Sequence, residues 1–347
     1  MKVTVLGVNS AFATGVYQDA IALKEAWALV KQSACAPEFK DVADEVLEAE
    51  LKKRSQRYYT PQWQSNFLIE FDMPDKRGKN GPYRLLVDAG ADVRHALKGV
   101  GLTSADIDGI YISHPHSDHI GGVEYLALTM LFNPAYTPAK REWLGNQFIA
   151  DKLFLEQETW PTPPPNAKPD LFVHSKVLGP LRRAVGPGLD TVQGVPDVRL
   201  ETYFDIHVIG KQTSGKTKKY IFQDGEEHWK MTPIFAMHVI SSSEEMASYG
   251  ISLEHDSGYN VLFPTDTQHM MPPQLVSHYR RAHRIYMDCE TAKFPSGVHP
   301  HISALVNQME PDIQKKCLLY HYDQTPDVPE GMFAGILKAG DAHTYPQ

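Results

Sequence analysis

Residues 113–122 of the chain read SHPHSDHIGG and place three histidines and an aspartate within six positions. The stretch follows the apolar run IDGIYI and ends in two glycines, so it reads as a loop between a β-strand and a helix. Pro115 keeps His114 extended and out of the helical region of backbone space. A solvated, histidine-rich loop is the simplest alternative. Four side chains of these types at this spacing instead favour convergence on a metal ion.

The donor types narrow the kind of metal site. Imidazole and carboxylate suit zinc, manganese and iron, and the absence of thiolates argues against a closed structural zinc site. The three cysteines, Cys35, Cys289 and Cys317, are isolated and have no CxxC spacing. We therefore expect buried thiols in a reducing compartment, with cytoplasmic localisation, and no disulfide framework.

Composition limits the partners. The chain has 347 residues, 42% of them hydrophobic, a net charge of −8 and a sequence pI of about 6.0. This balance argues against a protein that coats nucleic acid or an anionic membrane. The opening MKVTVLGVNS reads as a first β-strand rather than a signal peptide, and no apolar stretch approaches the length of a membrane span. We expect a small-molecule substrate and no membrane partner, and a homodimer is left open.

Short β-type runs alternate with helical stretches along the chain, which indicates the α/β class. Two segments look inserted into this alternation. Residues 14–60 carry helical periodicity, and residues 133–205 are Pro-rich and irregular. We expect a single domain over residues 1–347 that contains both insertions.

The order H-x-H-x-D-H between a strand and a helix resembles the metallo-β-lactamase superfamily, whose fold is a four-layer αββα sandwich. Further stretches resemble the family in the same chain order. They are LVDAG (86–90), whose Asp88 would support the motif loop, AMHV (236–239) with His238, FPTDTQ (263–268) with Asp266, and LLYHYD (318–323) with His321.

The resemblance implies a site with two metal ions. One ion would be held by His114, His116 and His238, and the other by Asp118, His119 and His321, with Asp266 bridging them. We expect two divalent transition-metal ions, zinc first, with manganese or iron as alternatives. Such a pair activates water and stabilises an anionic transition state, and Asp118 is expected to be catalytic as well as a ligand. Many relatives have glycine where this chain has Thr265, a change that leaves the ligand chemistry intact.

The stretch around His238 favours one branch of the superfamily. It lacks the T-P-G-H turn of lactonases and resembles the ribonuclease Z and phosphodiesterase branch, as do VTVLGVNSAF and QSNFLIEF. In that branch a histidine shortly before the last ligand acts on the leaving group, and VHPHISALV (298–306) offers His299 and His301. We favour His301, which opens a predicted helix. The alternative is a helix-terminal histidine without a catalytic role.

These features predict a metal-dependent hydrolase that cleaves a phosphodiester. A small phosphodiester or cyclic nucleotide is favoured over RNA 3′ processing, because the chain is acidic and shows no clear Gly-rich basic arm. The first alternative is a lactone, ester or β-lactam hydrolase on the same metal centre. The second is a non-hydrolytic binding protein, against which the complete set of seven ligands argues.

A second motif has a different interpretation. GKQTSGKT (210–217) matches the P-loop pattern G-x-x-x-x-G-K-[ST], but a working P-loop must open a helix. The flanking stretches FDIHVIG and KKYIFQDG read as strands, so we expect a hairpin tip. Its lysines would form a solvated face that could still meet a substrate phosphate.

Overall fold

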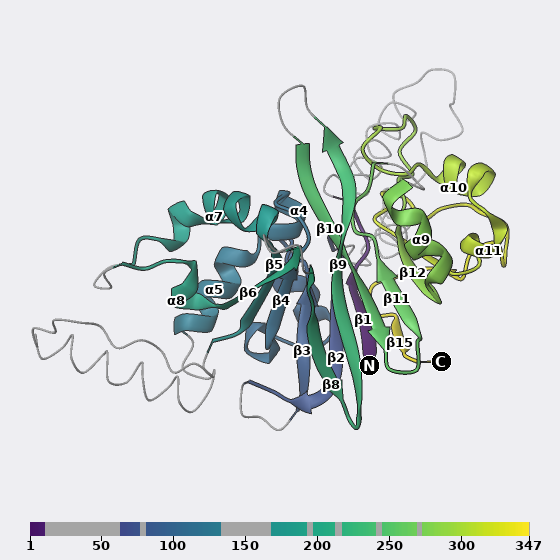
Figure 1. The fold of residues 1–347 in the computed structure, drawn as a ribbon. Coiled ribbons are helices and arrows are strands. Elements are labelled where there is room, and N and C mark those ends of the chain that lie inside the picture. The colour runs from purple at the N-terminus through teal and green to yellow at the C-terminus, as the bar shows by residue number, and fades with distance from the viewer. Residues whose placement is uncertain are drawn as a thin grey trace, which may run out of the picture.

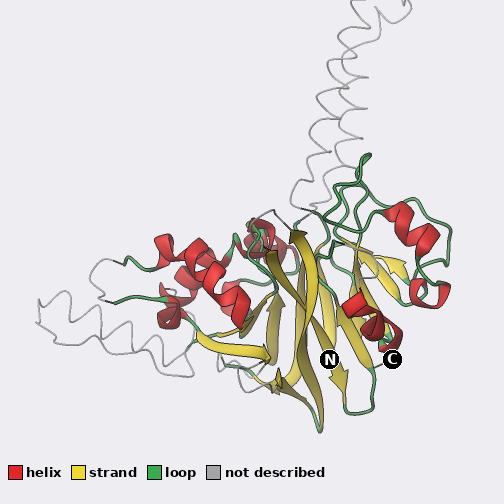
Figure 2. Ribbon diagram, turned by 45° about the horizontal axis from the view of Figure 1, so that its top comes forward, coloured by secondary structure: helices red, strands yellow, loops and turns green. Residues whose placement is uncertain are grey.

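A computed structural model of the chain describes residues 1–10, 63–76, 81–132, 168–192, 197–211, 217–240, 245–268 and 273–346. Two β-sheets pack face to face, and helices cover the outer side of each (Figure 1). The same layers are seen with the strands in yellow between two groups of red helices (Figure 2). The four-layer αββα sandwich expected from the sequence is therefore confirmed.

The first sheet has the strand order β15-β1-β2-β3-β4-β5-β6-β7. Strands β1 to β3 pair antiparallel, and β3 to β6 run parallel. The strands are β1 (Lys2–Gly7), β2 (Asn66–Pro74), β3 (Pro82–Val87), β4 (Gly109–Ile112), β5 (Asp170–His174), β6 (Asp205–Lys211), β7 (Thr217–Lys218) and β15 (Ala342–Thr344).

The second sheet has the order β14-β13-β12-β11-β10-β9-β8. Its strands β8 to β11 are antiparallel, and β11 to β14 are parallel. The strands are β8 (Tyr220–Asp224), β9 (Glu227–Ile240), β10 (Glu245–His255), β11 (Asn260–Phe263), β12 (Arg284–Asp288), β13 (Cys317–Tyr320) and β14 (Gly335–Ile336).

Three hydrophobic clusters fill the three interfaces between the four layers. The first lies between the first sheet and its helices, the second between the sheets, and the third between the second sheet and its helices. The first group of helices is α3 (Val93–Gly99), the 3-10 turn η2 (Ser104–Asp106), α4 (Ser117–Ile120), α5 (Val123–Phe132), α7 (Ser175–Leu189) and α8 (Leu200–Tyr203). The second group is α9 (Pro273–Arg281), α10 (Ile302–Gln308) and α11 (Pro311–Gln314).

The central segment is more regular than expected where it is described. The sequence predicted an irregular stretch over 133–205, but β5, α7 and α8 lie within its second half. Helix α7 was missed because it contains Pro180 and Pro187, which ordinarily mark breaks. Its core side is nevertheless periodic, with buried residues at every fourth position from Val177 to Leu189. Residues 14–60 and 133–167 lie outside the described residues.

The P-loop-like motif lies in a β-hairpin. Strands β6 and β7 pair antiparallel, with Gly210 opposite Lys218 and Lys211 opposite Thr217. Thr217 therefore begins a strand, whereas the corresponding residue of a working P-loop begins a phosphate-binding helix. The predicted hairpin is confirmed, although its tip, residues 212–216, lies outside the described part of the chain.

Two expectations from composition can be compared with the described residues. Within those ranges, no helix combines the length and apolar character needed to cross a bilayer. Cys289 and Cys317 are free and buried, as predicted, and Cys35 lies outside the described residues.

The stretch Ser248-Tyr249-Gly250 joins the two sheets. At Gly250 strand β10 passes so close to the end of β11 that an added Cβ would lie 2.3 Å from the carbonyl oxygen of Phe263. The Tyr249 N–H donates to the Ser113 carbonyl at 3.1 Å, and the Tyr111 hydroxyl donates to the Tyr249 carbonyl at 2.6 Å. Strand β10 is thus fastened to the end of β4, immediately before the histidine-rich loop.

Replacing Gly250 by alanine should lower the free energy of unfolding by about 1–3 kcal/mol, because the new methyl group overlaps backbone carbonyls. Gly99→Ala at the end of α3 is the matched control. Apart from its chain neighbours, its added Cβ meets nothing closer than Trp63 Nε1 at 3.6 Å, and it should stabilise by about 0.5–1 kcal/mol. Urea unfolding measures both. Equal stability of the two variants would contradict the close approach of β10 to the end of β11 at Gly250.

Candidate metal centre

All seven side chains predicted as metal ligands lie together where strands of both sheets end. Each is buried except His116, which is half-buried. The loop after β4 and helix α4 carry four of them, and the second sheet carries three near the ends of β9, β11 and β13. They are His114, His116, Asp118, His119, His238, Asp266 and His321.

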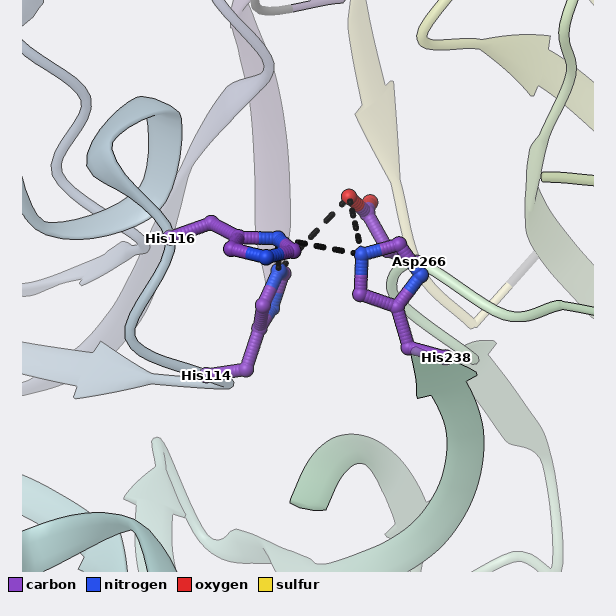
Figure 3. A group of neighbouring side chains, drawn as sticks. All are labelled: His114, His116, His238 and Asp266. Carbon is purple, nitrogen blue, oxygen red and sulfur yellow. Dashed lines mark hydrogen bonds and ion pairs between the residues drawn. The ribbon is translucent and has the colours of Figure 1, made fainter. Parts of the chain in front are cut away.

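The first group contains three imidazoles and one carboxylate (Figure 3). His116 Nδ1 lies 3.0 Å from His114 Nε2 and 3.1 Å from His238 Nε2. Asp266 Oδ2 lies 3.7 Å from His114 Nε2 and 3.8 Å from His238 Nε2. In Figure 3 the rings of His114 and His116 approach from one side, and His238 and Asp266 face them.

The second group shares Asp266 with the first. Asp266 Oδ2 lies 3.0 Å from His119 Nε2 and 3.6 Å from His321 Nε2. Asp118 Oδ2 lies 3.4 Å from His119 Nε2 and 3.5 Å from His321 Nε2. The ligand sets expected from the sequence therefore meet at a common carboxylate.

Hydrogen bonds on the far side of the rings orient the imidazoles. His119 Nδ1 donates to Asp88 at 2.8 Å, and His238 Nδ1 donates to the Val298 carbonyl at 3.0 Å. His114 Nδ1 lies 3.0 Å from the Ser113 hydroxyl, which itself donates to Asp88. Because these Nδ1 atoms are engaged, the Nε2 lone pairs face the centre, as in metal-ligating histidines.

Asp88 holds the motif loop as predicted. Its carboxylate accepts three hydrogen bonds of 2.8 Å each, from the Ser113 N–H, the Ser113 hydroxyl and His119 Nδ1. One buried side chain therefore fixes both ends of the loop that carries His114 and His116.

The backbone is strained at three strand ends around the site. Asp88, Thr265 and His321 have φ of 60°, 62° and 66°, and they are three of the four non-glycine residues with positive φ among the described residues. Such a conformation costs of order 1–3 kcal/mol and is an outlier for a β-branched residue. The glycine that many relatives have in place of Thr265 would adopt it without strain.

The pKa values of the histidines shift in opposite directions in the two groups of ligands. Burial lowers the pKa of His114 and His116, and it lowers that of His238 to about 4, so these rings are neutral. Burial also lowers the pKa of His119 and His321, but the surrounding carboxylates, Asp266 foremost, together outweigh it and raise both pKa values well above the usual one.

The residues present fit divalent transition-metal ions. The first group offers three neutral nitrogens and a carboxylate, and the second offers two imidazoles and two carboxylates. Asp266 Oδ1 is buried without a hydrogen-bond partner, which is costly unless a cation binds it. No thiolate belongs to either group, in keeping with zinc, manganese or iron rather than a structural zinc site.

Asp288 was missed by sequence reasoning. It is fully buried at the end of β12, and its Oδ2 accepts from His299 Nδ1 at 2.8 Å. Its Oδ1 lies 3.4 Å from His321 Nδ1, so one carboxylate contacts two imidazoles. The available signal was its position, because a parallel strand ending in an acid delivers that acid to the same edge as the ligands.

The structure places the two candidate leaving-group histidines differently. The His299 ring lies 5.0 Å from that of His238 and 4.6 Å from that of His321, centroid to centroid. His301 caps α10, where its Nδ1 accepts from the Ser303 N–H at 3.2 Å. Its Nε2 donates to the Ala292 carbonyl at 3.0 Å. His299 thus joins the metal-ligand groups, whereas His301 binds neighbouring loop and helix atoms.

The sequence model of the Anti-Pycsar protein Apyc1 family matches residues 56–157 and 157–341. The chain belongs to the Apyc1 family. An Anti-Pycsar protein Apyc1 of Bacillus phage 010DV004 is 27% identical over 294 residues, which cover 84% of this chain and 93% of the relative.

Solved structures share the fold of this Apyc1-family chain. The metallo-β-lactamase fold protein YhfI from Bacillus subtilis has a TM-score of 0.51 and 15% identity, covering 99% of this chain and 98% of that one. A long form RNase Z from yeast has a TM-score of 0.50 and 11% identity, covering 99% of this chain and 42% of that one. The metallo-β-lactamase fold expected from the sequence is confirmed. The resemblance to ribonuclease Z includes a stretch of 46 residues, 13% of this chain, that is 48% identical to a Ribonuclease Z of Aeropyrum pernix.

Elemental analysis of the purified Apyc1-family chain should find two divalent transition-metal ions per chain. His116→Ala should lose at least one because it removes a donor of the first group, and Asp266→Ala should lose at least one because both groups share it. His228→Ala is the control, since its exposed ring pairs with Asp256 on the surface and both ions should remain. A metal-free wild type that is folded and active would refute the assignment.

Proposed function

We propose that the chain is a dinuclear metal-dependent phosphodiesterase that acts on a small phosphodiester such as a cyclic nucleotide. The observation that carries the proposal is the pair of ligand groups sharing Asp266, with His299 against them and held by Asp288. Two adjacent cations and an imidazole acid are suited to displacement at phosphorus, where charge develops on attacking and leaving oxygens alike.

The proposed ligands are those predicted from the sequence. His114, His116 and His238 would hold one ion, and Asp118, His119 and His321 the other, with Asp266 between them. When bound, the ions, zinc in the first instance, supply an acidified water and positive charge at the phosphoryl oxygens.

The chain's own residues orient the reactants and move protons. Besides its role as a ligand of the second group, Asp118 would orient the attacking water and accept its proton. As the new phosphorus–oxygen bond forms and the old one breaks, His299 Nε2 would protonate the departing oxygen. Asp288 bonds the opposite ring nitrogen, which fixes the tautomer and stabilises the charged ring.

Charge supports a small substrate. The net charge of −8 disfavours a long polyanion such as RNA, while a single phosphodiester needs positive charge only at the site. The missing T-P-G-H turn disfavours lactones. We further propose that the chain folds as one domain and acts in the cytoplasm, where the free thiols of Cys289 and Cys317 would remain reduced.

The reaction class is tested by parallel assays with added manganese or zinc. Bis-aryl phosphates and 3′,5′-cyclic nucleotides should be hydrolysed, and lactones, cephalosporins and precursor tRNA should give little turnover. The expectation follows from charge compensation built for a phosphodiester anion. Faster turnover of lactones or cephalosporins than of either phosphodiester would overturn the proposal and leave the fold unaffected.

Leaving-group dependence distinguishes the two histidines. His299→Ala should keep both metal ions and lower kcat by roughly 10²–10⁴-fold for an alkoxide leaving group, with a smaller loss for nitrophenolate, which departs without a proton. His301→Ala should show no such dependence, because its ring contacts Ser303 and Ala292. The reverse pattern would assign the acid to His301, as the sequence suggested.

A further inference from the structure

The loop between β12 and α10 carries an exposed aromatic side chain. Phe294, in the stretch TAKFPSGVH (291–299), is 76% exposed. Among the described residues it and Ile221 are the two large apolar side chains that are exposed. A single exposed apolar residue is ordinary, but this one lies on a loop whose other end, Val298 and His299, contacts the proposed ligands.

The loop is held at several points. The Ser296 N–H donates to both carboxylate oxygens of Glu290, at 3.0 and 2.9 Å. At its start the Ala292 carbonyl accepts from His301 Nε2 at 3.0 Å, and at its end the Val298 carbonyl accepts from His238 Nδ1 at 3.0 Å. The tip is therefore preorganised, and a ligand that binds there does not have to order the loop.

The chemistry of the tip suits an aromatic, anionic ligand. Lys293, Phe294 and Pro295 are all exposed, and Lys293 Nζ lies 5.5 Å from the centroid of the Phe294 ring. The loop thus offers an open aromatic face with a cation against it. Nucleobases stack on such faces whatever their sequence, and a nearby cation favours the attached phosphate.

We propose that Phe294 is a specificity-determining residue whose ring stacks on the nucleobase of the substrate while the phosphodiester lies at the metal centre. This inference rests on the proposed phosphodiesterase function. Lys293 would contribute positive charge next to the Phe294 ring. In this arrangement His301 has a structural role, because its hydrogen bond to the Ala292 carbonyl holds the start of the loop.

Steady-state kinetics of the metal-loaded chain tests the proposal with a 3′,5′-cyclic nucleotide and with the abasic cyclic ribose 3′,5′-phosphate. Phe294→Ala should raise KM for the cyclic nucleotide by about 5- to 100-fold, the loss expected for one stacked base, with little change in kcat. KM for the abasic compound should not change. Phe294→Trp should restore the wild-type KM, and Ile221→Ala, the other exposed apolar position, should leave it unaltered.

Calorimetric binding of a nucleoside monophosphate gives a readout without turnover. Phe294→Ala should weaken this binding by a similar factor. A wild-type KM and Kd in Phe294→Ala, or an equal loss for the abasic compound, would overturn the stacking role while the phosphodiesterase assignment stands. Wild-type protein that turns over no phosphodiester but binds the nucleotide through Phe294 would refute only the proposed reaction.

Discussion

Four carboxylates are buried at the edge where the two sheets end, and the free energy of keeping their charge there constrains the rest of the structure. Asp88, Asp118, Asp266 and Asp288 are each less than a tenth exposed. A buried carboxylate is tolerated only when hydrogen bonds or opposite charge compensate it. Each of the four contacts at least one histidine, so imidazoles and carboxylates form one continuous network. The same arrangement that makes burial tolerable also provides the donors for cations.

Building this network needs both sheets, and local strain accompanies it. Asp88, Thr265 and His321 have left-handed conformations where their strands end. Asp88 and His321 in this way direct their own side chains into the site, and Thr265 directs the side chain of the next residue, Asp266. The hydrogen bonds of Tyr249 to the end of β4 oppose any sliding of the second sheet against the first. Strain of this kind persists where the surrounding packing holds the backbone in place. Here the hydrophobic cluster between the two sheets provides that packing.

The sequence is informative wherever function is encoded in one short stretch. His114, His116, Asp118 and His119 share a loop, so their spacing predicts their convergence, and strand ends located Asp266 and His321. The pairing of Asp288 with His299 depends on how two segments meet in space, and no local pattern encodes it. Helix α7 was hidden by Pro180 and Pro187, which lie away from its core side. The sequence favoured His301 as the leaving-group acid because it begins a helix. At that position its two ring nitrogens form hydrogen bonds with Ser303 and Ala292.

The division of the ligands between the sheets has a consequence for folding. Four of them follow β4 of the first sheet, and three belong to the second, so the proposed ions would act as cross-links between two halves of the chain. Ligands that bind only the folded state add to its stability by mass action. The stability of the sandwich would then depend on the concentration of free metal. A cell that limits free metal would lower the stability of the enzyme as well as its activity.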